Sequence, residues 1–552
     1  MVPRSEDLST LPQSLRQLLA ARGVVGDEEL KRFFSPSLAQ LAKPEALPGI
    51  VEAAKVVAEA IEAGREIVVF GDYDCDGICA TAVMVTAVRA LGGRATPFLP
   101  KRLTEGYGMN AASVSRMLAE NPGVGLVVTV DNGINSVEQV AALKARGIAV
   151  VVTDHHLPGA ELPKADALAN PKVASPAELN GLCGAGVAFM LANRLVDDAR
   201  TRGSYSGPSI GGPLLILAGL ATVTDIMPLV NQNRVLVKIA LERFRQLAPI
   251  GLKELFDRAS RSGAQTMTSK DFGFLLGPRI NAAGRIADGM EALDLVLSDD
   301  REIAREFARI VDGYNVQRKE VEQKMTEVAL TKMVAGASAQ VIELNGGHPG
   351  VVGIVAARIM EKAGGVPTCV VVDGRGSARA PEGVNIRDAM EACSAVLENF
   401  GGHAAAGGFT VKPGQVDEFR RLLTEYFDRA KQAEGPAENG GVRVDAWVEP
   451  KELTLEFCEW LARIEPFGEG NPEPVFGMKG LMFSEVRPMG MDGKHLSLNF
   501  HSRECPRAVW WNRGDLVEKL RADSARPHDL YFTAGISEYG ERHVELYVVG
   551  LD

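Results

Sequence analysis

Carboxylates and histidines gather in four short segments of the first half of the chain, each preceded by apolar residues. The segments read G-D-Y-D-C-D-G, V-D-N-G, T-D-H-H and T-V-T-D-I-M-P-L, and their candidate catalytic residues are Asp72, Asp74, Asp76, Asp131, His155, His156 and Asp225. Mg²⁺ and Mn²⁺ prefer carboxylate oxygens, and Mn²⁺ also accepts imidazole nitrogens. Closely spaced carboxylates repel one another unless a cation lies between them. These residue types and spacings therefore predict a site for divalent cations.

Two cations a few ångströms apart would suit a phosphoryl displacement, because they stabilise the attacking and leaving oxygens and lower the pKa of a bridging water. The candidate metal ligands are Asp74, Asp76, Asp131, His155 and Asp225, with one carboxylate bridging the two ions. His155 and His156 are adjacent and cannot point the same way from regular structure. One is expected to bind metal and the other to face the substrate phosphate. A single Asp in such a position is more often a turn residue or a helix cap, so the prediction rests on the combination.

The elements that must position these side chains alternate between strand and helix. Strands are predicted at 66–72, 125–133 and 148–156, with helices at 79–91 and 136–147. This alternation is typical of βαβ units, which form a parallel sheet with helices on both faces. Ligands of such sheets bind beyond the carboxyl ends of the strands. The candidate residues fall at those ends, and a further apolar segment, 214–229, carries Asp225.

At 552 residues the chain is too long for one ordinary core. A long helical region with few breakers could connect two α/β domains. A polar stretch at 430–441 is typical of a linker, and the short β-type runs beyond it favour a small barrel or sandwich. The predicted parts are a helical extension that packs on the first domain (1–50), a catalytic domain (51–300), a connecting helix (301–335), a smaller α/β domain (336–430) and a small β-barrel or sandwich (442–552).

Composition narrows the class of protein. With 46% hydrophobic and 24% charged residues, the chain is globular. The formal net charge of −11 counts against a basic nucleic-acid-binding face, although acidic outer helices can hide a local basic groove. Seven scattered cysteines without a C-x-x-C pair predict reduced thiols in a cytoplasmic protein. No secretory signal is expected, and the charge-poor segment 207–224 predicts a buried helix rather than a membrane span.

Further residues could bind phosphate or DNA. In L-G-P-R-I-N-A-A-G-R-I, guanidinium groups that fork onto phosphate oxygens lie among small residues, and G-G-H-A-A-A-G-G-F exposes backbone N–H groups beside a histidine. The candidates are Arg279, Asn281, Arg285, His348, Arg358, Arg379, Gly402 and His403. Salt-bridged surface arginines and an ordinary glycine turn are the alternatives. Stacking on bases is conceivable for Phe500, Trp510, Trp511, Tyr531 and Phe532, with core packing expected for at least half of them.

Taken together and in order, the motifs from about 66 to 410 resemble the DHH phosphoesterase superfamily, and specifically its RecJ branch of single-stranded-DNA-specific 5′→3′ exonucleases. The segment I-E-P-F-G-E-G-N-P-E-P-V-F (464–476) extends the resemblance into the β-rich tail. The implied fold is α/β. It has a parallel-sheet DHH domain, a smaller α/β DHHA1 domain joined by a long helix, and a C-terminal OB-like β-barrel.

The resemblance implies roles for the candidate residues. The five metal ligands named above would hold two Mn²⁺ or Mg²⁺ ions, with Asp72 beside them, and His156 would contact the scissile phosphate. Arg279, Asn281 and Arg285 would grip the strand, and His403 would close the site. The implied reaction is hydrolysis of successive phosphodiesters from a 5′ end, with release of 5′-mononucleotides, in DNA recombination and repair. The implied partners are single-stranded DNA, a helicase and a single-strand-binding protein, for a monomer away from membranes.

Other members of the superfamily remain alternatives. An oligoribonucleotide or cyclic-dinucleotide phosphodiesterase is the nearest, but such chains are usually shorter and lack the tail barrel. A non-catalytic replication scaffold would have lost metal ligands, and a manganese-dependent pyrophosphatase would not need the arginine loop or the barrel. Two departures from the family pattern stand out. Cys75 lies where alanine is frequent, and Gly346 and Gly347 precede His348 where tryptophan is frequent.

Overall fold

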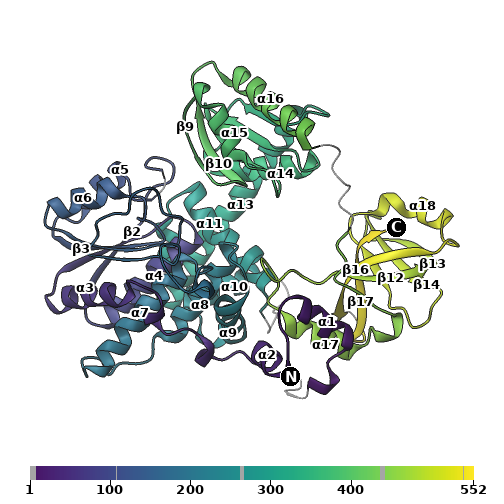
Figure 1. Ribbon diagram of the computed structural model, residues 1–552, viewed down its shortest axis with the longest axis horizontal. Coiled ribbons are helices and arrows are strands. Elements are labelled where there is room, and N and C mark those ends of the chain that lie inside the picture. Colours follow the sequence, from purple (N-terminus) through teal and green to yellow (C-terminus); the bar gives the residue numbers. More distant parts are fainter. Residues whose placement is uncertain (1–7, 107, 261–266, 435–441, 539) are drawn as a thin grey trace.

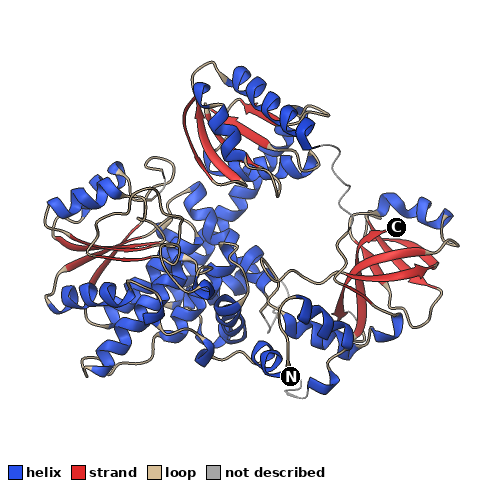
Figure 2. Ribbon diagram, viewed as in Figure 1, coloured by secondary structure: helices blue, strands red, loops and turns tan. Residues whose placement is uncertain are grey.

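The computed structural model describes residues 8–106, 108–260, 267–434, 442–538 and 540–552. Three separate sheets mark three α/β or β domains, which Figure 2 shows in red. Residues 435–441 of the predicted linker lie outside the described residues. The linker prediction is wrong for 430–434, because helix α16 continues to Glu434.

The catalytic sheet has five parallel strands in the order β2-β1-β3-β4-β5. The strands are β1 (Glu66–Phe70), β2 (Arg94–Phe98), β3 (Val124–Val130), β4 (Ala149–Thr153) and β5 (Ala167–Ala169). The order in which successive strands are added to the sheet reverses between β1 and β3, and ligands of open α/β sheets bind at such a point. The carboxyl ends of β1, β3 and β4 are neighbours there, which brings the predicted site segments together. The predicted parallel sheet is confirmed.

Helices cover both faces of this sheet, because alternate strand residues face opposite cores. Val69 and Val128 join the larger core, whereas Phe70 and Val127 join the smaller one. The helices of the larger core are α3 (Ile50–Glu62), α4 (Cys75–Ala90), α7 (Gly184–Thr201) and α8 (Gly211–Thr224), and those of the smaller core are α5 (Ala111–Glu120) and α6 (Val137–Ala145). Most of α8 is buried, as predicted, and it ends one residue before Asp225. None of the described helices is both long enough and apolar enough to cross a membrane.

Further helices extend the larger core toward the second domain. They are α9 (Asn231–Leu247), α10 (Ile250–Ala259), a π-helical segment (Asp271–Leu276), α11 (Gly277–Ile286), α12 (Met290–Leu297) and the long α13 (Arg301–Thr331). Figure 1 shows α13 rising from the catalytic domain to the second α/β domain at the top of the view.

The second domain is a mixed sheet in the order β6-β7-β8-β10-β9 with three helices. Its elements are β6 (Gln340–Leu344), α14 (Val352–Lys362), β7 (Thr368–Val372), β8 (Arg375–Arg379), α15 (Ile386–Ala392), β9 (Leu397–Gly402), β10 (Ala406–Val411) and α16 (Val416–Glu434). The G-G-H-A-A-A-G-G-F motif forms the turn between β9 and β10, so its glycines belong to a hairpin.

The C-terminal domain is a seven-stranded sheet in the order β11-β12-β16-β17-β15-β14-β13. Its elements are β11 (Ala446–Trp447), α17 (Leu455–Ile464), β12 (Phe476–Leu481), β13 (Phe483–Met489), β14 (His495–Phe500), β15 (Ala508–Trp510), α18 (Val517–Ala522), β16 (His528–Ser537) and β17 (His543–Leu551). Phe500, Trp510 and Phe532 are buried in its core, whereas Trp511 is half exposed. The prediction of core packing is therefore confirmed for three of the five aromatic residues.

The N-terminal helices do not pack where the sequence suggested. Helices α1 (Gln13–Ala21) and α2 (Asp27–Phe34) share a core with the C-terminal domain, and the rings of Phe34 and Trp460 lie 5.1 Å apart. The end of the predicted extension does pack on the catalytic core, with Leu41, Ala42 and Ala46 against it and Leu47 within it. The prediction that 1–50 pack on the first domain is wrong for the buried apolar residues of both helices, although the centre of the Phe33 ring of α2 lies 3.6 Å from the Arg234 guanidinium of α9. An amphipathic pattern identifies the apolar face of a helix but not the surface that covers it.

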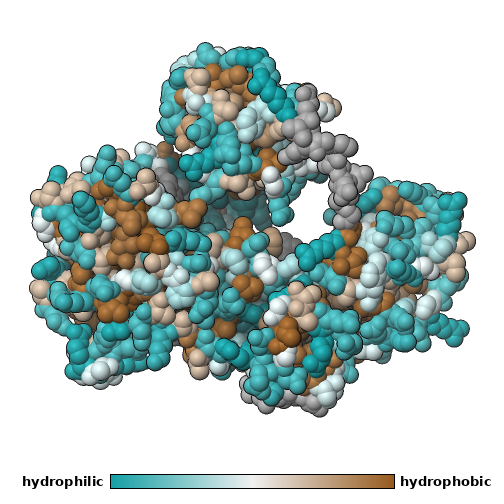
Figure 3. Space-filling view, viewed as in Figure 1, coloured by the Kyte–Doolittle hydropathy of each residue, from teal (hydrophilic) through white to brown (hydrophobic). Residues whose placement is uncertain are grey.

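The three domains leave an open space between them. Figure 3 shows this opening in the middle of the view, between the catalytic domain, the second α/β domain and the C-terminal domain. The amino-terminal end of the described chain lies beside the C-terminal domain in Figure 1, in agreement with the shared core.

Candidate metal centre

The first carboxylate segment is a tight turn that ends in a helix N-cap. The Asp74 side chain caps α4, because its Oδ1 accepts hydrogen bonds from the backbone N–H groups of Asp76 and Gly77 at 3.0 Å each. A Cβ at Gly77 would lie only 2.6 Å from the backbone of Asp72, so the turn needs glycine there. The turn in this way holds the side chains of Asp72, Asp74 and Asp76 at the carboxyl end of β1.

Asp76 is fixed by the N-terminus of α7. Its two carboxylate oxygens accept hydrogen bonds from the backbone N–H groups of Gly184 and Ala185, at 2.7 Å each. Unsatisfied N–H groups and the positive end of the helix dipole both favour an anion there. A Cβ at Gly184 would lie 2.4 Å from the Cβ of Asp131, so only glycine allows the helix to approach this closely.

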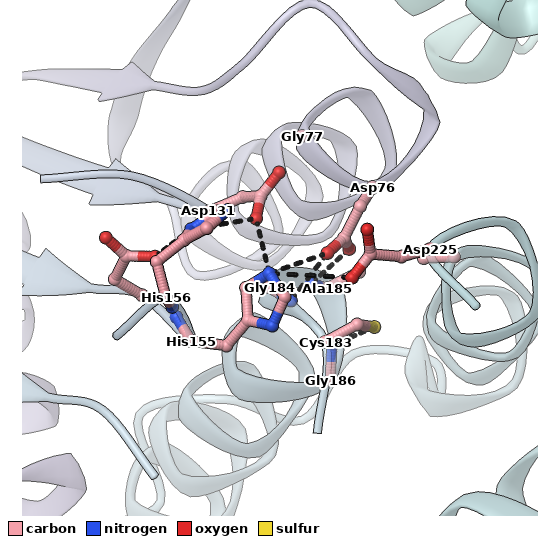
Figure 4. Close-up of polar contacts among 12 residues, drawn as sticks. Asp76, Gly77, Asp131, His155, His156, Cys183, Gly184, Ala185, Gly186 and Asp225 are labelled. Atoms are coloured by element: carbon pink, nitrogen blue, oxygen red, sulfur yellow. Dashed lines mark hydrogen bonds and ion pairs between the residues drawn. The ribbon is translucent and has the colours of Figure 1, made fainter. Parts of the chain in front are cut away.

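The remaining candidate side chains converge on His155. Its Nε2 lies 3.1 Å from Asp131 Oδ1, 3.6 Å from Asp76 Oδ2 and 3.6 Å from Asp225 Oδ2. Figure 4 shows these four side chains pointing toward one another from β3, β4 and the starts or ends of α4 and α8. The structure therefore brings together, in one place, four of the five predicted metal ligands, with Asp74 in the adjoining turn.

Several atoms at this point are buried without a hydrogen bond from any residue that the structure describes. They are Asp72 Oδ1, Asp131 Oδ1, His155 Nε2 and Asp225 Oδ2. Buried polar atoms are almost always hydrogen-bonded, so a concentration of exceptions needs a cause. Three sets of side chains have possible ligand atoms within 4.8 Å of one another: Asp76 with His155 and Asp225, Asp72 with Asp74 and Asp131, and Asp131 with His155 and His156. The residues fit two divalent ions, and Asp131 also lies within reach of the first set.

Burial and mutual repulsion perturb these carboxylates. Burial, followed by the charges of neighbouring carboxylates, raises the pKa of Asp72 and Asp131 well above the ordinary value and that of Asp225 to about 9. The pKa of Asp76 is also raised by burial, and burial lowers the pKa of His155. The cluster therefore resists carrying its full negative charge, and divalent cations would remove that resistance.

Asp154 has a role that the sequence did not indicate. Its Oδ1 accepts hydrogen bonds from the His155 and His156 backbone N–H groups and lies 2.7 Å from His156 Nδ1, while Oδ2 accepts one from the Ile134 N–H. Burial tends to lower the pKa of His156, but the Asp154 carboxylate outweighs it and raises that pKa to about 9. His156 is thereby held as a cation beside the carboxylate cluster. The T-D-H-H motif contains Asp154, but the sequence does not show in which direction the Asp154 side chain points.

A group of cations lies on the other side of the Asp72 turn. Burial and the charge of Arg102 lower the pKa of Arg285 to about 10, and the same two causes lower the pKa of Arg379 and His348. The Arg102 guanidinium lies 5.1 Å from the centre of the Tyr73 ring. The cations of this group are the three arginines, which come from both α/β domains, because the lowered pKa leaves His348 uncharged near neutral pH. Arg102 was missed because a basic residue in a loop has no periodic or motif signal.

Other predicted phosphate-binding residues have partners within the protein. Arg279 Nε lies 2.9 Å from Asp312, Asn281 Oδ1 accepts a hydrogen bond from the Cys75 N–H at 2.8 Å, and Arg358 forms an ion pair with Glu322. His403 is exposed at the β9–β10 turn, next to Gly402, whose φ is 134°. The structure thus brings together the residues around Asp72 and Asp131, whereas DNA binding by Arg279, Asn281, Arg358, Gly402 and His403 stays a prediction.

A parallel sheet whose neighbouring strand ends carry carboxylates and histidines defines a metal-dependent phosphoesterase of the DHH class. Sequence models of three families match: the DHH family N-terminal domain at 66–210, the DHHA1 domain at 336–429 and the RecJ OB domain at 444–549. These matches, together with curated relatives up to 39% identical, show that the chain belongs to the RecJ family. The predicted α/β fold with DHH, DHHA1 and OB domains is confirmed.

Named relatives cover most of the chain. The single-stranded-DNA-specific exonuclease RecJ of Dickeya dadantii is 39% identical over 85% of this chain and 83% of the relative. The protein of the same name from Bacillus subtilis is 32% identical over 91% of this chain, which spans 63% of that longer relative. Crystal structures of RecJ from Thermus thermophilus cover 98% of this chain. The complex with Mn²⁺ has a TM-score of 0.82 at 30% identity over 78% of its chain, and the complex with Mg²⁺ has 0.76 at 28% over 77%.

Proposed function

We propose that this protein is a single-stranded-DNA-specific 5′→3′ exonuclease that hydrolyses phosphodiester bonds at two divalent metal ions and releases 5′-mononucleotides, in DNA recombination and repair. The observation that carries the proposal is the convergence, at one edge of the sheet, of buried atoms of Asp72, Asp131, His155 and Asp225 that make no hydrogen bond within the described part of the chain. The names of the relatives supply the substrate class, single-stranded DNA. The C-terminal OB domain favours this function over a dinucleotide phosphodiesterase, the nearest alternative.

The metal is proposed to be Mn²⁺ or Mg²⁺, since RecJ of Thermus thermophilus has been crystallised with each. Asp76, His155 and Asp225 would hold one ion, Asp72 and Asp74 the other, and Asp131 would lie between them. When bound, such ions supply Lewis-acid stabilisation of the phosphoryl oxygens and lower the pKa of a bound water. His155 suits Mn²⁺ better than Mg²⁺, because Mg²⁺ prefers oxygen ligands.

The chain's own residues would orient the substrate. His156 keeps its proton through Asp154 and can donate a hydrogen bond to a phosphate oxygen next to the carboxylates. Arg102, Arg285 and Arg379 would bind phosphates of the strand, since guanidinium groups form paired hydrogen bonds with phosphate oxygens. We extend the DNA- or phosphate-binding proposal to Arg279, Asn281, His348, Arg358, Gly402 and His403.

The parts of the chain would divide this work. We propose a catalytic domain at 51–300, a connecting helix at 301–335, a DHHA1 domain at 336–430 that closes the site, and an OB domain at 442–552 that binds the strand. The extension at 1–50 would join the first and last of these. We further propose a cytoplasmic monomer that receives single strands from a helicase and a single-strand-binding protein.

A nuclease assay with 5′- and 3′-labelled single strands and duplexes tests the proposal. Wild-type protein with Mn²⁺ is expected to release labelled mononucleotides from the 5′ end of a single strand only. Asp76→Ala should abolish that release while its circular dichroism spectrum stays unchanged, because the variant loses a metal ligand. Cleavage of di- or trinucleotides alone, or release from the 3′ end, would contradict the proposal.

A further inference from the structure

Two strongly exposed apolar side chains lie on the segments around the end of α8, which leads into Asp225. Phe274 is 79% exposed and Ile226, the residue after Asp225, is 71% exposed. Among the large apolar side chains of the described residues, only Met491 is more exposed than either. Single exposed apolar residues are common on protein surfaces, but both of these lie on segments that adjoin the end of α8, which leads into Asp225. These two side chains are called the patch below.

The backbone of Ile226 is unusual for its residue type. Its φ is 56°, in the left-handed region, where a β-branched side chain is strongly disfavoured. The residue is held there by the end of α8, since the N–H groups of Ile226 and Met227 donate hydrogen bonds to the carbonyls of Val223 and Thr222. Backbone strain of this kind persists where the surrounding structure enforces it, and it concentrates at functional sites.

Phe274 is presented by an equally unusual element. It lies in the π-helical segment Asp271–Leu276, a rare conformation that is frequent at functional sites. Phe272 and Leu276 in the same segment are fully buried, which fixes the inner face of the segment. The segment is pressed against the end of α8, because a Cβ at Gly277 would lie 2.4 Å from Thr224 Cγ2. Phe274 is therefore exposed on a segment whose other side packs against the last residues of α8, just before Asp225.

The patch lies between the metal centre and the C-terminal domain. The Leu229 N–H donates a hydrogen bond to the Glu469 carbonyl at 2.7 Å, three residues beyond Ile226. On the other side, the Ser269 hydroxyl donates one to the Phe467 carbonyl at 2.6 Å, ahead of the π-helical segment. The segment 467–469 of the C-terminal domain thus contacts both sequence segments that carry the patch.

We propose that Phe274 and Ile226 form a platform on which nucleobases of the substrate strand stack as the strand passes from the metal centre toward the C-terminal domain. The inference rests on the proposed function, and it adds residues that select the substrate. Stacking on an aromatic ring tolerates any sequence, because every base has a π-face. The platform would favour unpaired strands, because the bases of a duplex are already stacked on their neighbours.

Substitution of Phe274 gives the first test. In steady-state hydrolysis of a single strand with Mn²⁺, Phe274→Ala should raise KM roughly tenfold and leave kcat within about twofold, since base stacking supports binding. Phe274→Trp should restore KM. Ile303→Ala is the matched control, because Ile303 is 53% exposed on α13, and it should leave both constants unchanged. A fall in kcat without a change in KM, or no rescue by tryptophan, would overturn the platform.

Strands with one abasic site, moved stepwise from the 5′ end, give the second test. At one position the missing base should weaken binding of the wild-type protein as much as Phe274→Ala does, and the two changes together should add nothing further. This binding is measured by fluorescence anisotropy with Ca²⁺ in place of Mn²⁺. Additive losses at every position would overturn the platform. The proposed exonuclease function has its own test, independent of the platform: it is wrong if the wild-type protein releases no mononucleotides in Mn²⁺.

The same proteins also test whether a second copy of the chain, rather than nucleobases, covers the patch. In sedimentation velocity, the wild-type protein and Phe274→Ala should show the same single species without DNA. A wild-type dimer that Phe274→Ala dissociates would assign the patch to a second copy of the chain and overturn the proposal.

Discussion

Two groups of buried like charges can be compared within this molecule. At the metal centre, Asp72, Asp76 and Asp131 are buried together, and oxygens of Asp72 and Asp131 have no hydrogen bond from the described residues. At the boundary with the C-terminal domain, Arg234 and Lys238 of α9 lie close together in the same way. Arg234 Nη1 and Nη2 donate to the carbonyls of residues 464 and 463, and Lys238 Nζ donates to that of residue 465.

Burial perturbs the pKa values of both groups, yet the surroundings of the two groups differ. Burial, and then the charge of Arg22, lowers the pKa of Arg234 to about 9, and burial, and then the charge of Arg234, lowers that of Lys238 to about 8. These cations satisfy the last carbonyls of α17, where the helix dipole favours positive charge. Asp76 has the N–H groups at the start of α7, but Asp72 Oδ1, Asp131 Oδ1 and Asp225 Oδ2 have no hydrogen-bond donor among the described residues. Arg234 Nε is also buried without such a partner, so neither a perturbed pKa nor one unpartnered atom separates function from structure. What separates them is the concentration of unpartnered atoms from several elements at one point of the metal centre.

The largest expected effect tests the positioning of the carboxylates. Gly184→Ala should lower the affinity for Mn²⁺ by about 10- to 100-fold, because the new Cβ would collide with Asp131 and displace the helix that holds Asp76. Isothermal titration with Mn²⁺ measures the change. Gly186→Ala, in the same helical turn, is the control, since its Cβ would come no closer than 3.3 Å to a neighbouring atom, Leu182 Cδ2. Equal affinities for the two variants would show that α7 does not position the site.

The next effect concerns the partnered cations. Arg234→Leu should destabilise the protein by about 1–3 kcal/mol, because it leaves buried carbonyls of α17 without a donor. Denaturant unfolding measures the loss, with exposed Arg243→Leu on the same helix as the control. Hydrolysis of short single strands by the folded variant should be unchanged. Loss of that activity would mean that the boundary cations act in the site and would break the comparison.

The sequence predicted the parallel sheet and the site segments because strand ends in such a sheet meet at one edge. Asp76, Asp131, His155 and Asp225 could thus be placed together from their spacing and types. The role of Asp154 could not, because it depends on the direction of a side chain in a turn. Gly184 and Arg102 carry no motif signal, and the packing of α1 on the C-terminal domain depends on contacts over four hundred residues apart, such as that between Thr10 and Trp460.

A smaller effect should appear in the metal-free protein. With a chelator present, Asp225→Asn is expected to raise Tm by at least roughly 2–4 °C, or about 1 kcal/mol, because it removes one of several mutually repelling buried carboxylates. Addition of Mn²⁺ should raise the Tm of the wild-type protein more than that of the variant. Differential scanning calorimetry measures both values. A lower Tm for the metal-free variant would mean that Asp225 has a stabilising partner and would remove the contrast between the two groups.

The smallest effect concerns Lys238 and pH. Its pKa is about 8 in the folded protein and 10.5 in the unfolded chain, so the unfolded chain binds more protons between these values. The free energy of unfolding should therefore rise with pH in this window, by about 1 kcal/mol between about pH 8 and pH 9, relative to Lys238→Met, which has no such proton. Below pH 8 the difference between the two proteins should be constant, because Lys238 is charged in both states. Denaturant unfolding at several pH values measures the difference. A difference that falls as pH rises would mean that the carbonyls of α17 stabilise the Lys238 cation more than burial destabilises it.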